Sequence, residues 1–251
     1  MRSCLINPMG TSPMVASEMY RYLRNGDAGL RDIVLVHTSS RNVISGSRAA
    51  TGAILTRYPD ARVHWAELDS DDITSESDLY NFLSTVIKTI VRERDQFGVT
   101  KFYLNVSGGR KIQSIVLSMY AGLLRIGEVY NIIDTDMENY NSGYEMIKDI
   151  VQSFYPLSRQ EDIVDLYRRN SEALDGIFFP DPERLSFLRV PVIEFPEDEL
   201  NLIKTLIMGT SLDDAGIPDF KVKAYQASGI IGCDRHRTWP TDLGKILLQY
   251  M

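Results

Sequence analysis

The stretch KFYLNVSGGRKIQSIVLSMY, residues 101–120, decides the fold. Its first five residues read as a strand, its last ten read as the start of a helix, and a glycine-rich turn lies between them. The stretch CLINPMGTSPMVASEMY, residues 4–20, shows the same order of strand, glycine turn and helix. Two such units predict repeated βα units and a mostly parallel sheet.

Outward from these units, strand-like runs alternate with longer helical patterns through the first 135 residues. The strands are expected at 3–7, 32–37, 62–68, 101–105 and 128–133, and the helices at 13–24, 41–58, 75–97 and 111–125. Ser75 with Asp78 resembles a capping box at the start of the third helix. We therefore predict an α/β fold, a Rossmann-like open and mostly parallel sheet with helices on both faces.

The alternation stops near Val151, where a polar helical stretch, 158–174, leads into a segment with four prolines. This change predicts three parts: a ligand-binding domain over 1–155, a helical linker over 156–196 and a C-terminal domain over 197–251. In the last part we expect helices at 197–208, 211–216, 219–228 and 241–250, with a hairpin across 229–240. This order is similar to that of a small winged helix.

The composition is that of an ordinary globular protein. The 251 residues are 44% hydrophobic and 24% charged, and no apolar run reaches the roughly 18 residues of a bilayer span. The start carries one basic residue and few apolar ones before Pro8, which does not fit a secretory signal. We expect a cytoplasmic protein with no membrane partner.

Metal and cofactor chemistry find little support in the sequence. Cys4 and Cys233 are the only cysteines, and the three histidines stand in no ligand spacing, so we expect no metal and no cofactor. The run DSDD, residues 69–72, is interpreted as a solvated acidic turn. A formal charge of −7 argues against nonspecific coating of nucleic acid, although a local basic pocket is compatible with it.

Two loops carry the candidate chemistry, residues 7–13 (NPMGTSP) and residues 105–111 (NVSGGRK). Each follows a strand and opens a helix, where free backbone N–H groups and the helix dipole favour an anion. Both are expected at the carboxyl ends of parallel strands, the edge at which open α/β sheets bind ligands. The glycines permit close approach, the hydroxyl side chains can donate hydrogen bonds, and Arg110 with Lys111 adds positive charge. This pattern predicts a phosphate-type site.

Other interpretations of these loops stay open. Glycine turns with a Ser or Thr N-cap occur in any α/β fold. Neither loop has the Gly-x-Gly-x-x-Gly spacing of dinucleotide enzymes or the phosphate loop of nucleotide triphosphatases, which disfavours both classes. Ser107 lacks a Gly-x-Ser-x-Gly elbow and is a poor acyl-transfer nucleophile. An α/β protein that binds another nucleotide or a phosphorylated metabolite remains an alternative.

The pair of motifs MGTSP, residues 9–13, and SGGRK, residues 107–111, resembles the CARF domains, the CRISPR-associated Rossmann fold of antiviral defence. The resemblance covers residues 1–155. It implies a homodimer in which the loops of both subunits form one basic pocket for cyclic oligoadenylate, with cyclic tetra-adenylate as the favoured ring. The expected ligand-binding residues are Met9, Gly10, Thr11, Ser12, Asn105, Ser107, Gly108, Gly109, Arg110 and Lys111.

Some CARF proteins are ring nucleases, so the resemblance also implies a possible activity. Such enzymes cut the ring without metal: a ribose 2′-OH attacks the adjacent phosphate and leaves a 2′,3′-cyclic phosphate. Here Lys111 would stabilise the transition-state charge, and Ser12, or Thr11 beside it, would orient the 2′-OH. The same residues would serve a sensor that only holds the ring, so the enzyme status stays open.

The C-terminal part leaves the output of such a sensor open. It lacks the Arg-x-x-x-x-His motif of a family ribonuclease. As a winged helix, residues 219–240 would contact DNA, with Lys221 and Lys223 on the recognition helix and Arg235 and Arg237 in the wing. Residues 197–251 hold six basic and eight acidic side chains, which is not the positive footprint of a DNA reader. A messenger-controlled transcription factor is thus one alternative, and a tail for dimerisation or for covering the pocket is another.

Overall fold

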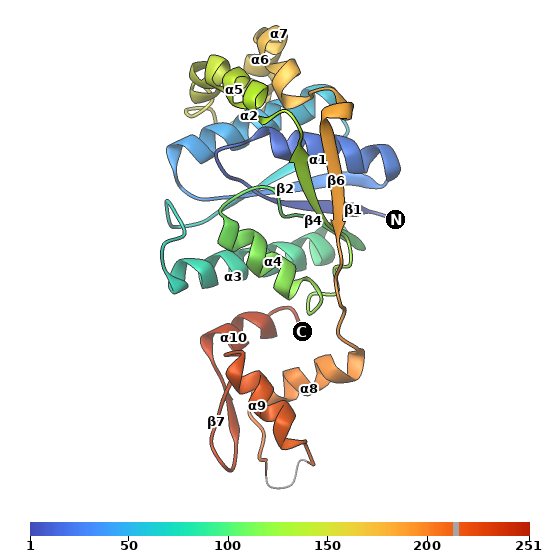
Figure 1. Ribbon diagram of the computed structural model, residues 1–251, viewed down its shortest axis with the longest axis vertical. Helices are drawn as coiled ribbons and strands as arrows, with labels where there is room; N and C mark the ends of the chain where they lie inside the picture. The colour runs from blue at the N-terminus through green and yellow to red at the C-terminus, as the bar shows by residue number, and fades with distance from the viewer. Residues whose placement is uncertain (213–215) are drawn as a thin grey trace.

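The computed structural model describes residues 1–212 and 216–251, without the side chains of residues 137–141. Its centre is a six-stranded sheet in the order β3-β2-β1-β4-β5-β6 (Figure 1). The strands are β1 (Ser3–Pro8), β2 (Leu30–His37), β3 (Arg62–Glu67), β4 (Lys101–Asn105), β5 (Val129–Asp134) and β6 (Leu185–Val190). The first five run parallel, and β6 is antiparallel to β5. The five strands expected from the sequence are confirmed to within two residues.

Helices cover both faces of this sheet (Figure 1). One face carries α1 (Met14–Gly26), α2 (Arg41–Arg57), α5 (Met137–Gln152), α6 (Gln160–Arg169) and α7 (Ser171–Phe178), and the other carries α3 (Glu76–Phe97) and α4 (Lys111–Ala121). β1 is buried along its whole length, as expected of a central parallel strand that is covered on both sides. The predicted α/β fold class is confirmed.

The long helix α3 shows how local sequence sets an element. The Ser75 Oγ accepts a hydrogen bond from the Asp78 N–H at 3.1 Å, and the Asp78 carboxylate accepts one from the Ser75 N–H at 2.9 Å. The predicted capping box is therefore confirmed. Gly98 ends the helix with a φ of 67°, a left-handed conformation that glycine adopts without strain. The apolar side chains that α3 buries are Phe82, Leu83, Val86, Ile87 and Ile90.

The segment expected as a helical linker, residues 156–196, contains α6, α7 and an element that we did not expect. β6 pairs with β5 from Val129 opposite Val190 to Asp134 opposite Leu185, so this part of the chain extends the sheet. The prolines that suggested a boundary flank the strand, where the missing N–H groups interrupt no ladder. A six-residue strand between prolines has too little apolar pattern to be separated from a linker by sequence alone.

The C-terminal part follows β6 and contains α8 (Glu197–Met208), α9 (Asp219–Ala227), the hairpin of β7 (Ile231–Cys233) and β8 (Thr238–Pro240), and α10 (Asp242–Leu248). The expected helices at 197–208, 219–228 and 241–250 and the expected hairpin correspond to these elements. The helix expected at 211–216 includes 213–215, which lie outside the described residues, and Ser211 itself forms a β-bridge with Arg237. The winged-helix likeness stays a prediction.

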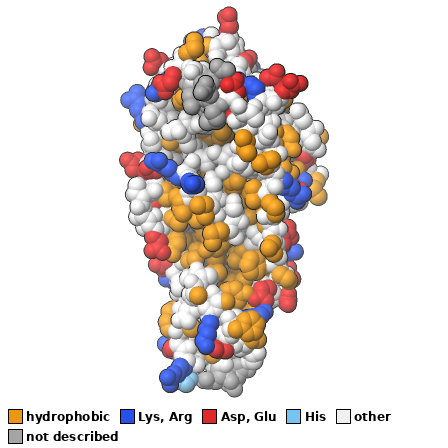
Figure 2. Space-filling model, viewed as in Figure 1, with side chains coloured by type: hydrophobic (Ala, Val, Ile, Leu, Met, Phe, Trp, Pro, Cys, Tyr) orange, Lys and Arg blue, Asp and Glu red, His pale blue; other side chains and the backbone are white. Residues whose placement is uncertain are grey.

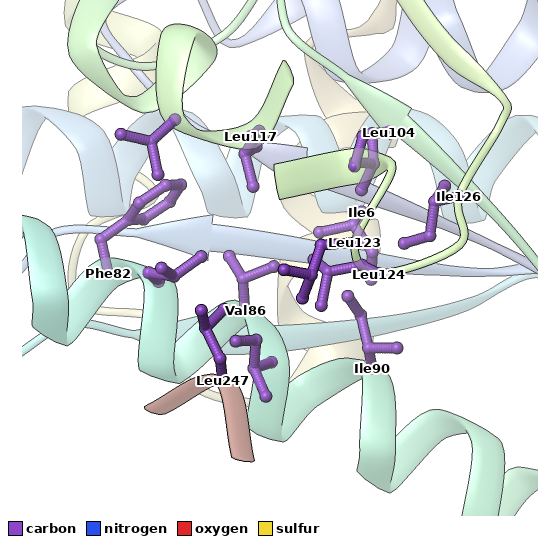
Figure 3. Close-up of a cluster of buried hydrophobic side chains, with 14 of the residues drawn as sticks. Ile6, Phe82, Val86, Ile90, Leu104, Leu117, Leu123, Leu124, Ile126 and Leu247 are labelled. Atoms are coloured by element: carbon purple, nitrogen blue, oxygen red, sulfur yellow. The ribbon is translucent and has the colours of Figure 1, made fainter. Parts of the chain in front are cut away.

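The C-terminal part shares its core with the sheet. Leu247 of α10 lies beside Val86 of α3, within the same buried cluster as Ile6 of β1 and Leu104 of β4 (Figure 3). The Tyr250 hydroxyl donates a hydrogen bond across this junction to the carbonyl of Leu124, which follows α4, and Lys204 bonds the Met251 carbonyl within the C-terminal part. In the described ranges, none of the helices has the length and apolar character that a membrane crossing needs.

Candidate functional site

The two loops predicted from the sequence lie side by side. Residues 9–13, here called the β1 loop, and residues 106–110, the β4 loop, follow strands that pair in register in the middle of the sheet. The strand order reverses direction between β1 and β4 (Figure 1). Such a switch point opens a crevice at the carboxyl ends of the strands, which is where ligands of open α/β sheets bind.

Glycine is required where the two loops meet. A Cβ atom on Gly10 would lie 3.0 Å from the Gly109 nitrogen, and one on Gly108 would lie 2.0 Å from the Pro8 carbonyl oxygen. Gly109 also has a φ of 77°, a conformation that side chains disfavour. Side chains at these positions would push the loops apart, so the glycines serve the close approach itself.

A buried asparagine pair fixes the loops from beneath. Asn7 and Asn105 are fully buried, and the Asn105 Nδ2 donates to the Asn7 Oδ1 at 2.6 Å and to the Val15 carbonyl at 3.2 Å. The Asn105 Oδ1 accepts from the Ser107 N–H at 2.9 Å, and the Asn7 Nδ2 donates to the Pro8 carbonyl at 3.0 Å. Asn105, expected as a ligand-binding residue, is therefore engaged in holding the loop scaffold.

A cleft of about 420 Å³ lies above the loops and receives residues from four of the five parallel strand ends. Its lining is Met9, Gly10, Thr11, Thr38, Ser40, Asn42, Val43, Asp71, Asp72, Gly109, Arg110 and Gln113. Five of these, Met9, Gly10, Thr11, Gly109 and Arg110, belong to the ligand-binding residues expected from the sequence. Both motifs thus contribute to one cleft.

The other lining residues escaped the sequence argument. Thr38, Ser40 and Asn42 follow β2, and Asp71 follows β3. These strands end at the same edge of the sheet as β1 and β4, so a polar run directly after a predicted strand was the available signal. The sequence argument assigned the acidic run 69–72 to a solvated turn and gave the run after β2 no role.

Four further expected residues do not line the cleft. Gly108 serves the loop contact, and the Ser107 hydroxyl donates to the Asn131 Oδ1 at 3.2 Å and accepts from a backbone N–H of β5. Ser12 is half-buried within the β1 loop. Lys111 is exposed at the first residue of α4, and in the described part of the chain no acidic side chain pairs with it. Its ammonium group is therefore free at the edge of the site.

Arg110, by contrast, is paired. Its Nε donates to the Asp72 Oδ1 at 2.7 Å, and its Nη2 contacts the Asp72 Oδ2. These hydrogen bonds from Arg110, together with one from the Ile73 N–H, hold the pKa of the Asp72 carboxyl below its ordinary value. The acidic turn that we interpreted as solvated is in fact in contact with the β4 loop.

Gln113 secures the backbone at this point. Its Oε1 accepts from the Arg110 N–H at 2.6 Å, which completes the first turn of α4. Its Nε2 is buried and has no hydrogen-bond partner among the described residues, and the same holds for the Thr38 Oγ1 across the cleft. Two lining residues of the cleft thus retain unused polar atoms.

Comparison with known proteins gives three similarities. A sequence model of the family described as CRISPR-associated protein NE0113 matches residues 21–208. The CRISPR system ring nuclease SSO2081 of Saccharolobus solfataricus is 27% identical over 150 residues, which cover 58% of this chain and 79% of that protein. The structure of Enterococcus italicus Csm6 bound to cyclic hexa-2′-fluoro-hexa-dAMP matches with a TM-score of 0.48 at 16% identity. That match covers 82% of this chain and 46% of the other, so the chain spans less than half of that structure.

Proposed function

The chain belongs to the CRISPR-associated protein NE0113 family, in keeping with the CARF resemblance of its loops, and on this premise we propose that it binds cyclic oligoadenylate. The observation that carries the proposal is the meeting of the β1 and β4 loops in one cleft at the switch point of the sheet. Gly10 and Gly109 line the cleft with their backbone, and Arg110 and Lys111 supply cations. A phosphodiester needs this combination of donors and positive charge.

We further propose that a homodimer shares the pocket. On α4, directly after the β4 loop, Ile112 is 38% exposed, Ile115 is 46% exposed and Met119 is 68% exposed. Their spacing places them along one side of the helix. Figure 2 shows apolar side chains gathered over the middle of the face on which α4 lies in Figure 1. A second copy seated here would cover this surface.

The symmetry of the ligand fits such a dimer. In an isologous dimer each contact occurs twice, so a pair at α4 would bring two β4 loops toward one axis. A ring of four adenylates has its own rotational symmetry and can present equivalent phosphates to equivalent residues. Two copies of Lys111 then act on one ligand, which explains how a protein with a net charge of −7 provides a basic pocket.

A second candidate activity is cleavage of the ring, favoured by the similarity to a protein named as a ring nuclease. The 2′-oxygen would form a bond to phosphorus as the bond to the 5′-oxygen breaks, and a proton would pass from the first oxygen to the second. Lys111 would stabilise the charge that develops on the phosphate, and its lack of an acidic partner in the described structure supports this role. Ser12 or Thr11 would align the 2′-OH.

The DNA-binding alternative gains no support from α9. Lys221 forms an ion pair with Glu199, which also accepts from the Tyr225 hydroxyl, and Lys223 pairs with Asp219. Both cations that we placed on a recognition helix are thus already neutralised. Arg235 and Arg237 of the hairpin are exposed, so any DNA contact would depend on the wing.

One experiment tests the binding proposal and separates it from the nuclease candidate. Purified protein is incubated with labelled cyclic tetra-adenylate in EDTA, and bound and cleaved ring are measured. A bound and intact ring indicates a sensor, whereas linear products with a 2′,3′-cyclic phosphate indicate a nuclease. Absence of binding to both cyclic tetra-adenylate and cyclic hexa-adenylate would refute the proposed function.

A further inference from the structure

The cleft contains acidic side chains that would repel its proposed ligand. Asp71 and Asp72 line it, although its proposed ligand is a polyanion. The Asp72 carboxylate engages the Arg110 guanidinium through both of its oxygens. A phosphate would use the same pair of parallel N–H groups, because carboxylate and phosphate bind an arginine fork in the same geometry.

We propose that Asp72 is an internal competitor for the ligand: it occupies the Arg110 fork in the free protein, and a phosphate of the ring displaces it. The inference rests on the proposed function. Arg110 is 65% exposed and Asp72 is 32% exposed at the side chain, so the pair is open to an incoming anion. Exposed ion pairs are weak, which keeps the exchange energetically accessible.

The exchange has a structural consequence beyond the cleft. The Asp72 carboxylate also accepts from the Ile73 N–H at 2.8 Å, so it fixes the turn that precedes α3. The first turns of α3, from Glu76 to Tyr80, line a second cleft together with Asp242 and Lys245 of α10. Displacement of Asp72 from Arg110 would remove the tether between this turn and the β4 loop. Because the turn leads into the helix on which the C-terminal part packs, we expect ligand binding to affect that part through α3.

The test is calorimetric titration of cyclic tetra-adenylate into matched variants. Asp72→Asn removes the competing charge and keeps the side-chain shape. Asp71→Asn is the control, because it removes an equal charge from the same cleft and Asp71 forms no ion pair with Arg110 in the described structure. We expect Asp72→Asn to tighten binding about tenfold, since the ring meets the pair twice in a dimer, and Asp71→Asn to tighten it about twofold.

A double-variant cycle isolates the competition. In an Arg110→Ala background there is no fork to occupy, so Asp72→Asn and Asp71→Asn are expected to have the same twofold effect. Hydrogen exchange adds an independent readout: the ring should raise exchange at residues 70–75 in the wild type, and Asp72→Asn alone should raise it without the ring.

Each outcome has a definite meaning. If Asp72→Asn binds the ring more weakly than wild type, Asp72 positions Arg110 for the ligand and the inference is wrong. Equal effects of the two single variants likewise overturn it, because the charge then acts only through the general field. Failure of the wild type to bind either ring refutes the proposed function instead, and the inference falls with it.

Discussion

Two buried carboxyl groups lie toward opposite ends of the same sheet and differ in how they are satisfied. Asp32, at the amino end of β2, is fully buried, and each of its oxygens accepts from both Arg2 and Arg62 at 2.8–3.0 Å. Glu18, on α1 near Asp134 at the carboxyl end of β5, is 2% exposed, and its Oε1 has no partner in the described structure. The Asp32 carboxylate is therefore saturated with hydrogen bonds, whereas the Glu18 carboxyl is not.

From this difference we expect Asp32 to affect the unfolding free energy and the residues of the cleft to affect ligand binding. The amino end ties β1, β2 and β3 together through Asp32. At the carboxyl end, the Gln113 Nε2 and the Thr38 Oγ1 are also buried without partners among the described residues, next to the cleft. Buried polar groups without partners cost free energy, and the two that line the cleft are available to a ligand. The Oε2 of Glu93, a fully buried carboxyl close to Asp32, also lacks a partner in the described structure, so such groups are not confined to one end of the sheet.

The largest expected effect is the loss of unfolding free energy when Asp32, at the amino end of the sheet, is replaced. Asp32→Ala leaves Arg2 and Arg62 without their shared acceptor, and removing one member of a buried ion network costs about 4 kcal/mol of unfolding free energy. Denaturant unfolding measures the loss. Asp95→Ala, which removes an exposed partner of Arg94, is the control and should cost about 1 kcal/mol or less. A folded Asp32→Ala protein with weakened ring binding would contradict the separation of the two ends.

The ionisation of Asp32 determines how the stability contributed by this network changes with pH. Burial raises the pKa of Asp32, but the hydrogen bonds from Arg2 and Arg62 outweigh it and keep the pKa below its ordinary value. The stability that Asp32 contributes is therefore present above the carboxyl's unfolded pKa and is lost as the pH falls through the folded one. For Glu18, the contribution to folding stability changes with pH in the opposite direction.

The second prediction concerns Glu18. Burial, and then the charge of Asp134, raises the pKa of Glu18 from 4.5 to about 8, against the opposing effects of Arg21 and Arg184. Folding then costs increasing free energy as the pH rises from about 4.5 toward 8, because only the unfolded state ionises over that range. Glu18→Gln should stabilise the protein by about 3 kcal/mol at pH 8 and leave it unchanged at pH 4.

Unfolding curves at the two pH values measure this effect. Glu145→Gln, at a carboxyl that is 65% exposed, serves as the control and should show no such pH dependence. Equal stabilisation by Glu18→Gln at both pH values would show that Glu18 is not held protonated in the folded protein.

Much of this arrangement followed from sequence, and the missing parts have a physical reason. Strand positions and both loops were predictable because buried parallel strands and glycine turns leave local signals. The partner of Arg110 was not, since Asp72 is 38 positions away and its acidic turn has no distinguishing pattern. The role of Asn105 depends on a hydrogen bond to Asn7, which only the pairing of β1 and β4 creates.

The third prediction concerns ligand affinity. Lys111→Ala removes one ammonium beside the cleft, or two in the proposed dimer, and a charge-assisted contact contributes about 1.5–3 kcal/mol. Cyclic tetra-adenylate should bind well over tenfold more weakly by calorimetry. If the protein cleaves the ring, single-turnover cleavage should fall further than binding does, and Ser12→Ala should also slow it. Lys88→Ala, on the exposed side of α3, should change neither. Unchanged binding by Lys111→Ala would refute the position of the pocket.

The smallest expected effect lies in the C-terminal part, where Lys221 and Lys223 of α9 each have an acidic partner. Lys221→Ala with Lys223→Ala breaks two ion pairs that are partly or largely exposed, so the unfolding free energy should fall by about 1 kcal/mol or less. DNA binding should not change, because both lysines have carboxylate partners and residues 197–251 hold more acidic than basic side chains. Titration of duplex DNA at several salt concentrations measures this. A salt-sensitive shift by the intact protein that loses about two charge contacts in the double variant would show that DNA outcompetes Glu199 and Asp219, and that α9 is a recognition helix.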